Sequence, residues 1–458
     1  MKRPIENIAS FDRAYFIGIG GIGMSALARY FKSKGWKVAG YDKTSTTITD
    51  ALESEGIAVH FEDLGENLPS HFLDTEKTLV VYTPAIPKEM KELLFVQAGS
   101  YSVMKRAQVL GMITRHSKAL GVAGTHGKTT TSAMLAHILN ESNQGCNAFL
   151  GGIGSNFNSN FVSHPTSPWT VIEADEFDRS FLQLTPYASI VTSTDADHLD
   201  IYGDDALFLE GFQAYIDLID PKGFAVLHKD ISLTTNNEIR YGLNADVDFS
   251  GRNLRVENHA FLMDVTTQNG AWNSVELGIP GTHNAENALA CIALGTKLGL
   301  TENLLRSALK SFKGVKRRFE YHIRTENRIY IDDYAHHPTE INALLDSVEL
   351  MYSNKKVIGV FQPHLFSRTR DFFDAFALAL SRLDEVVLLP IYPARELPIE
   401  GITSDALLMK ISASKKSVLQ PSEAIEYVAK TECEVILTIG AGDIDRIVSP
   451  LKNRLEHE

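Results

Sequence analysis

Short apolar runs rich in β-branched residues alternate with longer segments of helical periodicity along almost the whole chain. This alternation is typical of α/β folds with largely parallel sheets. Two apolar runs, at 14–20 and 119–124, each end in a glycine-containing turn that leads into a predicted helix. The segment 249–281 lacks helical periodicity, so we expect a β-rich excursion there. Four later runs also predict strands, at 328–335, 356–363, 385–393 and 434–442.

The length of 458 residues exceeds what one hydrophobic core normally serves. The alternating pattern divides the chain into three blocks, and we predict domains at 1–115, 116–319 and 320–458.

The formal net charge of -13 argues against nucleic-acid binding, which needs a basic footprint. The 3 cysteines form no closely spaced pair, so the sequence predicts neither a disulfide framework nor a zinc site. The first residues show no apolar signal segment, and no apolar run approaches membrane-spanning length. We therefore expect a soluble cytoplasmic protein without membrane insertion.

The stretch GTHGKTTT, at 124–131, has the residues of a phosphate-binding loop. Glycines between a strand and a helix let backbone amides converge on an anion, a lysine reaches the outer phosphates, and a hydroxyl binds magnesium. The strict pattern places a further glycine where this chain has Val122. The alternative is a helix cap followed by an exposed lysine.

Acidic residues follow two other apolar runs of the middle block. The first run ends in Glu173, with Asp175 and Glu176 behind it, and the second is followed by Asp195, Asp197 and His198. Each group alone is also consistent with a solvated loop. Together with the lysine-bearing turn they predict a single magnesium–nucleotide site for phosphoryl transfer.

The first block contains Gly18, Gly20 and Gly23 in a GxGxxG pattern between strand and helix, with Asp42 at the end of the next strand. NAD binding is the usual interpretation, with the acid bound to the ribose. The same turn can also hold any other pyrophosphate, or serve only as a structural connection.

Further polar residues start helices or end strands in the later part of the chain. Asn284 and Asn287 open a helix, where they can read a purine edge or only cap the helix. The basic run 316–318 can bind a phosphate or face solvent. In the third block the strand ends predict a ligand cleft; they carry Asp332, Asp333, Tyr334, His336, His337, His364, Arg368, Thr369, Arg370, Arg395, Glu396, Gly440, Gly442 and Asp443.

These motifs, in this order, resemble the Mur ligases of peptidoglycan synthesis. The resemblance rests on GTHGKTTT, EADEFDRSFL, DADHLD, HNAENALA, RRFEYH, DDYAHHPTE, FQPHLFSRTRDF and YPARE, and it covers nearly the whole chain. It implies three α/β domains: a Rossmann-like N-terminal domain, a central P-loop ATPase domain and a Rossmann-like C-terminal domain. It also implies that the opening glycine-rich turn holds a UDP-sugar rather than NAD.

The resemblance implies that ATP and Mg²⁺ activate the carboxylate of UDP-N-acetylmuramate as an acyl phosphate, which the amine of L-alanine attacks. Lys128, Glu173 and His198 would be catalytic, and Thr129, Glu173 and His198 would hold metal. The ATP-binding residues would be Gly124, Thr125, His126, Gly127, Lys128, Thr129, Thr130, Asn284, Asn287, Arg318 and Asp333. The UDP-sugar would meet Gly18, Gly20, Gly21, Gly23, Ser25, Asp42, Lys105 and Arg106. The amino acid would meet His336, His337, His364, Arg368 and Arg370.

Three alternatives stay open at this point. A murein tripeptide-recycling ligase would share the sugar and ATP sites but accept a longer peptide amine. An NAD-dependent oxidoreductase would use the GxGxxG turn, and UV difference titration would detect its cofactor. A nucleotide-binding regulatory protein would bind ATP without releasing phosphate.

Overall fold

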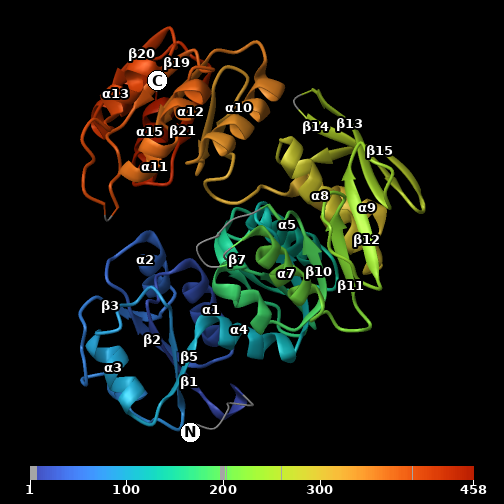
Figure 1. The fold of residues 1–458 in the computed structure, drawn as a ribbon, viewed down its shortest axis with the longest axis vertical. Coiled ribbons are helices and arrows are strands. Elements are labelled where there is room, and N and C mark those ends of the chain that lie inside the picture. Colours follow the sequence, from blue (N-terminus) through green and yellow to red (C-terminus); the bar gives the residue numbers. More distant parts are fainter. Residues whose placement is uncertain (1–7, 196–201, 203, 259, 395, 458) are drawn as a thin grey trace. The chain divides into compact units, whose positions relative to one another are not determined.

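The computed structural model of the chain describes residues 8–195, 202, 204–258, 260–394 and 396–457. These residues form two compact units, the first built mainly from the chain up to Phe312 and the second mainly from the chain after it. The described strands make three sheets, two in the first unit and one in the second (Figure 1). No helix in these ranges is long and apolar enough to cross a membrane.

The first sheet, drawn in blue and cyan in Figure 1, has five parallel strands in the order β3-β2-β1-β4-β5. The strands are β1 (Arg13–Ile17), β2 (Lys37–Tyr41), β3 (Ala58–His60), β4 (Thr78–Tyr82) and β5 (Ser102–Lys105). The helices are α1 (Ile22–Ser33), α2 (Thr47–Ser54), α3 (Lys91–Ala98) and α4 (Arg106–Arg115), with short 3₁₀ turns η1 (Ile8–Ser10) and η2 (Ser70–Phe72). The strand order reverses between β1 and β4, and ligands of open parallel sheets bind at the carboxyl end of such a switch point.

The second sheet has ten strands in the order β15-β14-β13-β12-β11-β10-β6-β9-β7-β8. They are β6 (Lys118–Ala123), β7 (Asn147–Gly154), β8 (Ser159–Val162), β9 (Trp169–Glu173), β10 (Pro186–Val191), β11 (Phe224–His228), β12 (Glu238–Leu243), β13 (Phe249–Glu257), β14 (Ala260–Thr267) and β15 (Gly270–Leu277). The helical elements are α5 (Lys128–Glu141), η3 (Phe177–Gln183), α7 (Asp205–Ile216), α8 (Thr282–Lys297) and α9 (Glu302–Ser311). Strands β13 to β15 confirm the predicted β-rich excursion.

Helix α1 joins the two sheets of the first unit. Its Tyr30 ring lies 5.4 Å from Phe149 on β7 and 6.0 Å from Phe161 on β8. Arg29, the residue before Tyr30, is buried. Its guanidinium donates to Glu55 and, over 2.5 Å, to Asn160 Oδ1 on β8. Apolar contact and a satisfied buried cation therefore fix the glycine-rich turn, which begins α1, relative to the ten-stranded sheet.

The sheet of the second unit has the order β16-β17-β21-β18-β19-β20, with β16 antiparallel to β17. The strands are β16 (Glu320–Arg324), β17 (Ile329–Asp333), β18 (Val357–Phe361), β19 (Glu385–Leu388), β20 (Lys415–Val418) and β21 (Val435–Ile439). The helices are α10 (Pro338–Tyr352), α11 (Phe366–Asp371), α12 (Phe373–Leu380), α13 (Ser404–Lys410), α14 (Pro421–Ala429) and α15 (Asp445–Glu456). The four predicted strands are confirmed. The two that sequence patterns missed, β16 and β20, are polar and lie at the sheet edges, where burial imposes no apolar run.

The α1 contact predicts a specific loss of stability. Arg29→Ala should lower the free energy of unfolding of the first unit by about 2 kcal/mol, because a buried Asn160 oxygen loses its donor. The three tryptophans all lie in this unit, so urea unfolding followed by tryptophan fluorescence measures it. The control, Lys32→Ala on the exposed side of α1, should change stability by less than about 0.5 kcal/mol. Equal midpoints for the two variants would contradict the assignment.

Candidate functional site

The turn between β6 and α5 has a backbone that only glycine adopts readily. Gly124 has a φ of 129° and Gly127, the N-cap of α5, a φ of 79°. A Cβ at Gly124 would lie 2.2 Å from Thr192 Oγ1, and one at Gly127 would lie 2.7 Å from Asn287 Oδ1. The turn thus leads tightly into the amide end of α5, as an anion-binding loop requires. The departure at Val122 from the strict pattern falls inside strand β6, outside the turn itself.

The ammonium group of Lys128 is bound within this loop. Its Nζ donates to Gly124 O over 2.7 Å, to Thr125 O over 3.4 Å and to Glu176 Oε1 over 2.8 Å. An ammonium group has three donors, so all of them are in use. Lys128 can therefore contact a phosphate only by exchanging one of these acceptors.

Glu176 is the buried partner in this ion pair. Its side chain is 2 % exposed, against 14 % for Lys128, and its Oε2 has no hydrogen-bond partner among the described residues. Burial raises the pKa of the Glu176 carboxyl, and the Lys128 charge opposes that shift. The carboxylate thus depends on Lys128 for its charged form.

Strand order brings the predicted strand ends together, as the sequence indicated. Strand β6 lies between β9 and β10. Val122 pairs with Glu173, and Ala123 pairs with Val191. Glu173 therefore emerges beside the start of the phosphate loop.

Glu173 is fixed in place by a glycine on the neighbouring strand β7. Its Oε2 accepts from the amide of Gly151 over 3.1 Å. A Cβ at Gly151 would lie only 2.2 Å from the same oxygen. A larger residue at 151 is therefore incompatible with this position of the carboxylate.

The segment after β10 supports the loop from its other side. Thr192 Oγ1 donates to His126 O, and the amide of His126 donates to Ser193 Oγ over 3.0 Å. Thr125 Oγ1 donates to Asp195 O over 2.6 Å. The predicted metal ligand His198, with Asp197, lies outside the described residues.

The asparagines of α8 lie behind the loop. Asn284 and Asn287 are buried, and Asn287 Nδ2 donates to Asn284 Oδ1 over 3.4 Å. Because Asn287 approaches Gly127, this pair is placed beside the N-terminus of α5. Thr129 and Thr130 occupy the first turn of α5 and are also largely buried.

The glycine turn of the first sheet is closed by Asp42. Its Oδ2 accepts from the amide of Gly20 over 2.7 Å. Gly18 has a φ of 89°, and Gly21 is the N-cap of α1. In this structure Asp42 thus shapes the turn, and its predicted contact with a ligand remains a prediction.

The residues predicted to accompany this turn differ in their accessibility. A Cβ at Gly23 would lie 2.7 Å from Arg106 Nη1, so the two predicted residues adjoin. Ser25 is buried, donates to Ile22 O over 3.0 Å and accepts from Asn160 over 2.8 Å. A ligand contact by Ser25 would require an exchange of these bonds.

In the second unit, Asp333 lies at the end of β17. Its carboxylate accepts from the amides of Phe319 and Ala335 over 2.7 and 2.8 Å. Burial raises the pKa of Asp333 to about 7, although these amides and Arg318 favour the anion. Arg318 is exposed, so its guanidinium is accessible to a ligand.

Arg317 holds the segment that carries Arg318. Its Nε donates to Asp332 over 3.2 Å and its Nη2 to Gly440 O over 2.6 Å. The guanidinium also lies 5.1 Å from the Tyr334 ring, and the Arg317 amide donates to Glu320 over 2.8 Å. Since Arg317 has a φ of 61°, these contacts stabilise an uncommon backbone conformation beside Arg318.

The two histidines after β17 are partly buried and start α10. His337 is the N-cap, and its Nδ1 accepts from the Thr339 amide over 3.3 Å. The amides of His336 and His337 both donate to Glu340, over 2.8 and 3.1 Å. The His337 ring also packs on Phe372 at 4.4 Å. Helix capping thus uses one nitrogen of His337.

His364 faces His336 with ring centroids 6.2 Å apart and stacks on Tyr392 at 5.7 Å. Arg368 Nη1 lies 3.3 Å from its Nδ1. Burial, Arg368 and His336 lower the pKa of His364. Arg370, by contrast, is exposed and pairs with its neighbour Asp371 over 2.8 Å.

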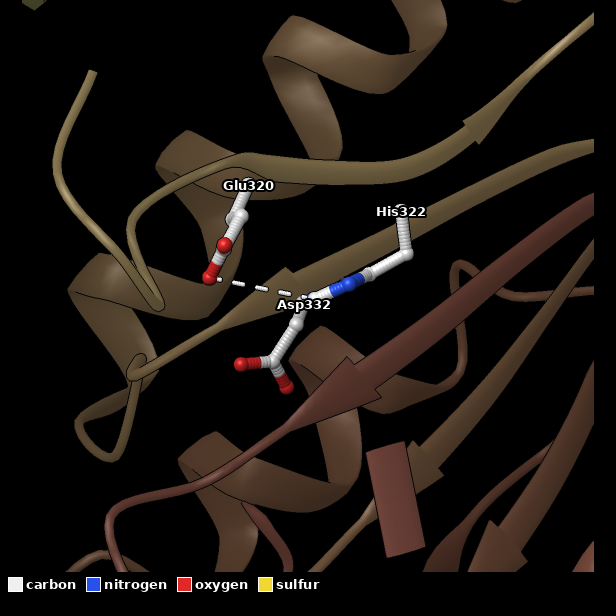
Figure 2. Close-up of side chains that lie close together, drawn as sticks. All are labelled: Glu320, His322 and Asp332. Carbon is white, nitrogen blue, oxygen red and sulfur yellow. Dashed lines mark ion pairs between the residues drawn. The ribbon is translucent and has the colours of Figure 1, made fainter. Parts of the chain in front are cut away.

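Figure 2 shows a separate cluster of Glu320, His322 and Asp332, whose candidate ligand atoms lie within 4.8 Å of one another. His322 Nε2 is 3.7 Å from Glu320 Oε2. Both Asp332 oxygens are already used, one by Arg317 and the other by Thr438 over 2.6 Å. A divalent cation would compete with the Arg317 guanidinium, so we interpret this cluster as an ion-pair network that positions Arg317.

Three known family profiles match the chain in sequence. They are described as "Mur ligase family, catalytic domain" at 13–118, "Mur ligase middle domain" at 122–295 and "Mur ligase, glutamate ligase domain" at 317–442. The chain belongs to the Mur ligase family. The three-domain Mur ligase architecture expected from the resemblance is thereby confirmed.

Individual relatives are similar in sequence to this chain over nearly its full length. A UDP-N-acetylmuramate–L-alanine ligase of Flavobacterium psychrophilum is 49% identical, covering 99% of this chain and 100% of the relative. One of Cytophaga hutchinsonii is 46% identical, covering 97% of each. Among solved Mur ligases, the UDP-N-acetylmuramate-alanine ligase MurC of Thermotoga maritima has a TM-score of 0.84 at 28% identity, covering 97% of this chain and 99% of that one.

Two residues of this Mur ligase gained importance only from the structure. The sequence groups Glu176 with the acids after β9, but spacing alone does not show that it pairs with Lys128. The sequence groups Arg317 with its basic neighbours and does not show that its guanidinium pairs with Asp332. The charge of each was visible in the sequence, whereas its partner was not.

The Glu173–Gly151 contact gives a prediction about metal affinity. Gly151→Ala should displace the Glu173 carboxylate and weaken Mn²⁺ binding, with a non-hydrolysable ATP analogue present, by about tenfold or more. Electron paramagnetic resonance of free Mn²⁺ measures this affinity. Glu173→Gln serves as the reference and should show a loss of similar size. Unchanged metal affinity in a folded Gly151→Ala protein would rule out the predicted role of Glu173.

Proposed function

We propose that this protein is an ATP-dependent ligase that joins L-alanine to UDP-N-acetylmuramate in the synthesis of peptidoglycan precursors. The observation that carries the proposal is the full-length similarity to ligases of that name, at 46% and 49% identity. The glycine turn that leads into α5 at Lys128 supports the proposal, because the phosphates of ATP require an anion-binding loop of this kind.

In the proposed reaction, the carboxylate of UDP-N-acetylmuramate attacks the γ-phosphorus of ATP, giving an acyl phosphate and ADP. The amine of L-alanine then attacks the acyl carbon, loses a proton and expels inorganic phosphate as the amide forms. A free carboxylate is a poor electrophile, and phosphorylation converts one of its oxygens into a leaving group. ATP therefore provides the driving force for the amide bond.

Each predicted ATP-binding residue has a place in this scheme. The loop of residues 124–130 cradles the phosphates with its backbone amides. Lys128 stabilises charge on the phosphoryl group in transfer. Arg318 contributes a further positive charge, Asp333 binds the ribose, and the asparagine pair of α8, Asn284 and Asn287, lies near the adenine.

The proposed Mg²⁺ ligands in the described chain are Thr129 and Glu173, and His198 completes the proposed set. A hydroxyl and a carboxylate are hard oxygen donors of the kind that Mg²⁺ prefers, and Glu173 adjoins the loop through the β6–β9 register. When bound, the ion would neutralise the repulsion between the phosphates and the substrate carboxylate. Gly151 keeps the Glu173 carboxylate directed for this task.

The UDP-sugar is proposed to bind at the glycine turn of the first sheet, at Gly18, Gly20, Gly21, Gly23, Ser25, Asp42, Lys105 and Arg106. The amino acid is proposed to meet His336, His337, His364, Arg368 and Arg370. Around His364, the lowered pKa favours a neutral ring, so the positive charge near it comes from Arg368. This arrangement suits the carboxylate of an amino acid.

The proposed domain limits remain 1–115, 116–319 and 320–458. Strand β6 opens the second sheet at Lys118, and β16 opens the third at Glu320, which supports limits close to these positions. Because ATP and nucleotide sugars are cytoplasmic substrates, we propose that the enzyme acts in the cytoplasm.

Phosphate release tests the function directly. With ATP, Mg²⁺ and UDP-N-acetylmuramate, the protein should release phosphate when L-alanine is added. A recycling ligase would respond instead to a tripeptide amine, and a regulatory protein to none. Phosphate release with the tripeptide alone, or UV difference spectra that show NAD at the glycine turn, would contradict the proposal.

The variant Lys128→Ala distinguishes the proposed ATP site from the proposed UDP-sugar site. Loss of the ammonium should lower turnover on the order of a thousandfold or more, because the phosphoryl group in transfer loses the positive charge of Lys128. UDP-N-acetylmuramate should still bind, since its predicted site lies on the first sheet. Calorimetry on the same preparation measures that binding. Loss of both turnover and UDP-N-acetylmuramate binding in a folded variant would count against the assignment of Lys128 to ATP.

A further inference from the structure

Residues 175–178, which follow β9 and include the start of η3, contact cations at both predicted substrate sites. Glu176 pairs with Lys128 of the phosphate loop over 2.8 Å. Asp175, one residue earlier, pairs with Arg106 over 3.2 Å, and Asp178 lies 3.6 Å from Lys105. The last two cations belong to the predicted UDP-sugar site. One run of residues 175–178 therefore neutralises cations of both sites.

We propose that Asp175, Glu176 and Asp178 are internal counter-ions, displaced by substrate phosphates, and that this displacement couples the ATP site to the UDP-sugar site. The proposal rests on the proposed function, because it takes Lys128 as a ligand of ATP and Lys105 and Arg106 as ligands of the UDP-sugar.

Displacement follows from the donor count at Lys128. Its three acceptors are two backbone oxygens and one carboxylate. The carboxylate is the only anion among them, and a triphosphate offers the same ammonium more charge and more acceptor oxygens. ATP therefore competes with Glu176 for Lys128.

Glu176 cannot keep its present position once ATP has displaced it from Lys128. Its side chain is buried, and its second oxygen already lacks a partner among the described residues. A buried carboxylate without a cation is strongly disfavoured, so the segment that carries it must rearrange. Since Asp175 and Asp178 lie within two residues of Glu176, they move with it, and Arg106 and Lys105 become free to bind the UDP-sugar.

The backbone of the segment is suited to such a rearrangement. Asp178 and Arg179 have φ values of 52° and 53°, a conformation that non-glycine residues rarely adopt, least of all in succession. The guanidinium of Arg179 lies 5.1 Å from the Tyr202 ring, and Tyr202 Oη donates to Glu176 O over 2.7 Å. A rearrangement of the segment would allow Asp178 and Arg179 to leave this uncommon backbone conformation.

The coupling must be reciprocal, because both ligands act on the same equilibrium. A nucleotide that frees Arg106 tightens the UDP-sugar, and the UDP-sugar tightens the nucleotide by the same factor. The test is calorimetric titration of UDP-N-acetylmuramate, with and without a saturating non-hydrolysable ATP analogue and Mg²⁺. For the wild type we expect about fivefold or more tighter binding with the analogue present.

Asp175→Asn isolates the contribution of the segment. Without nucleotide it should bind UDP-N-acetylmuramate about two- to fivefold more tightly than the wild type, because Arg106 no longer has a competing carboxylate. With the analogue present the two proteins should bind equally, because the wild-type carboxylate has then already left. Asp178→Asn should act in the same direction with a smaller effect, since that pair is more exposed.

The variant Glu176→Gln tests the contact of the segment with the ATP site. It should bind the ATP analogue about two- to fivefold more tightly in the absence of the sugar, and the analogue should no longer tighten the sugar, because no carboxylate is displaced from Lys128 when the triphosphate binds. The matched control is Glu210→Gln, an exposed acid on α7, which should behave as the wild type in every titration.

Two results would overturn the inference. One is an Asp175→Asn protein whose sugar affinity is unchanged or weaker without nucleotide, and the other is an equal change with and without it. Should the wild type bind and turn over both substrates while the variants show either result, only the coupling is wrong. A wild type that binds neither ligand would overturn the proposed function together with the inference.

Discussion

The candidate site depends on how the half-buried ammonium group of Lys128 is held. Lys128 begins α5, where the helix amides already favour an anion, and its ammonium is placed there by a turn whose two glycines have positive φ values. A cation beside a positive helix terminus is stable only if acceptors surround it, and two loop carbonyls with Glu176 provide them. The central strand β6 fixes the start of that turn between the ends of β9 and β10. At the amide end of α5, the Lys128 ammonium is thus neutralised by one of the protein's own carboxylates.

Other cationic side chains of the candidate sites are also paired with carboxylates of the protein. Arg106 pairs with Asp175 in the first unit, and Arg317 pairs with Asp332 in the second. Buried or half-buried guanidinium groups require such partners when no substrate is bound. At Arg106, an ion pair of moderate strength suits the proposed exchange, because the substrate must be able to replace Asp175. Packing between α1 and the β7–β8 hairpin holds the first two sheets together.

Sequence patterns sufficed for the features that depend on local chemistry. Apolar runs predicted β1, β6 and the strands β17, β18, β19 and β21 of the third sheet, and the glycine pattern predicted the turns that lead into α1 and α5. The patterns failed where a partner far along the chain decides the outcome. Edge strands β16 and β20 carry no apolar signal, the pairing of Glu176 with Lys128 spans 48 positions, and Asp42 proved to bond its own turn. Such pairings follow from sheet order, which periodicity does not reveal.

A crystal structure with a non-hydrolysable ATP analogue and Mn²⁺ tests the central claim most directly. The account predicts triphosphate density within the loop of residues 124–130, an Mn²⁺ signal beside Glu173, and a Lys128 ammonium that contacts phosphate oxygens instead of Glu176. It would be contradicted by a nucleotide bound elsewhere on the chain, or by a triphosphate in the loop with the Lys128–Glu176 pair still at hydrogen-bonding distance.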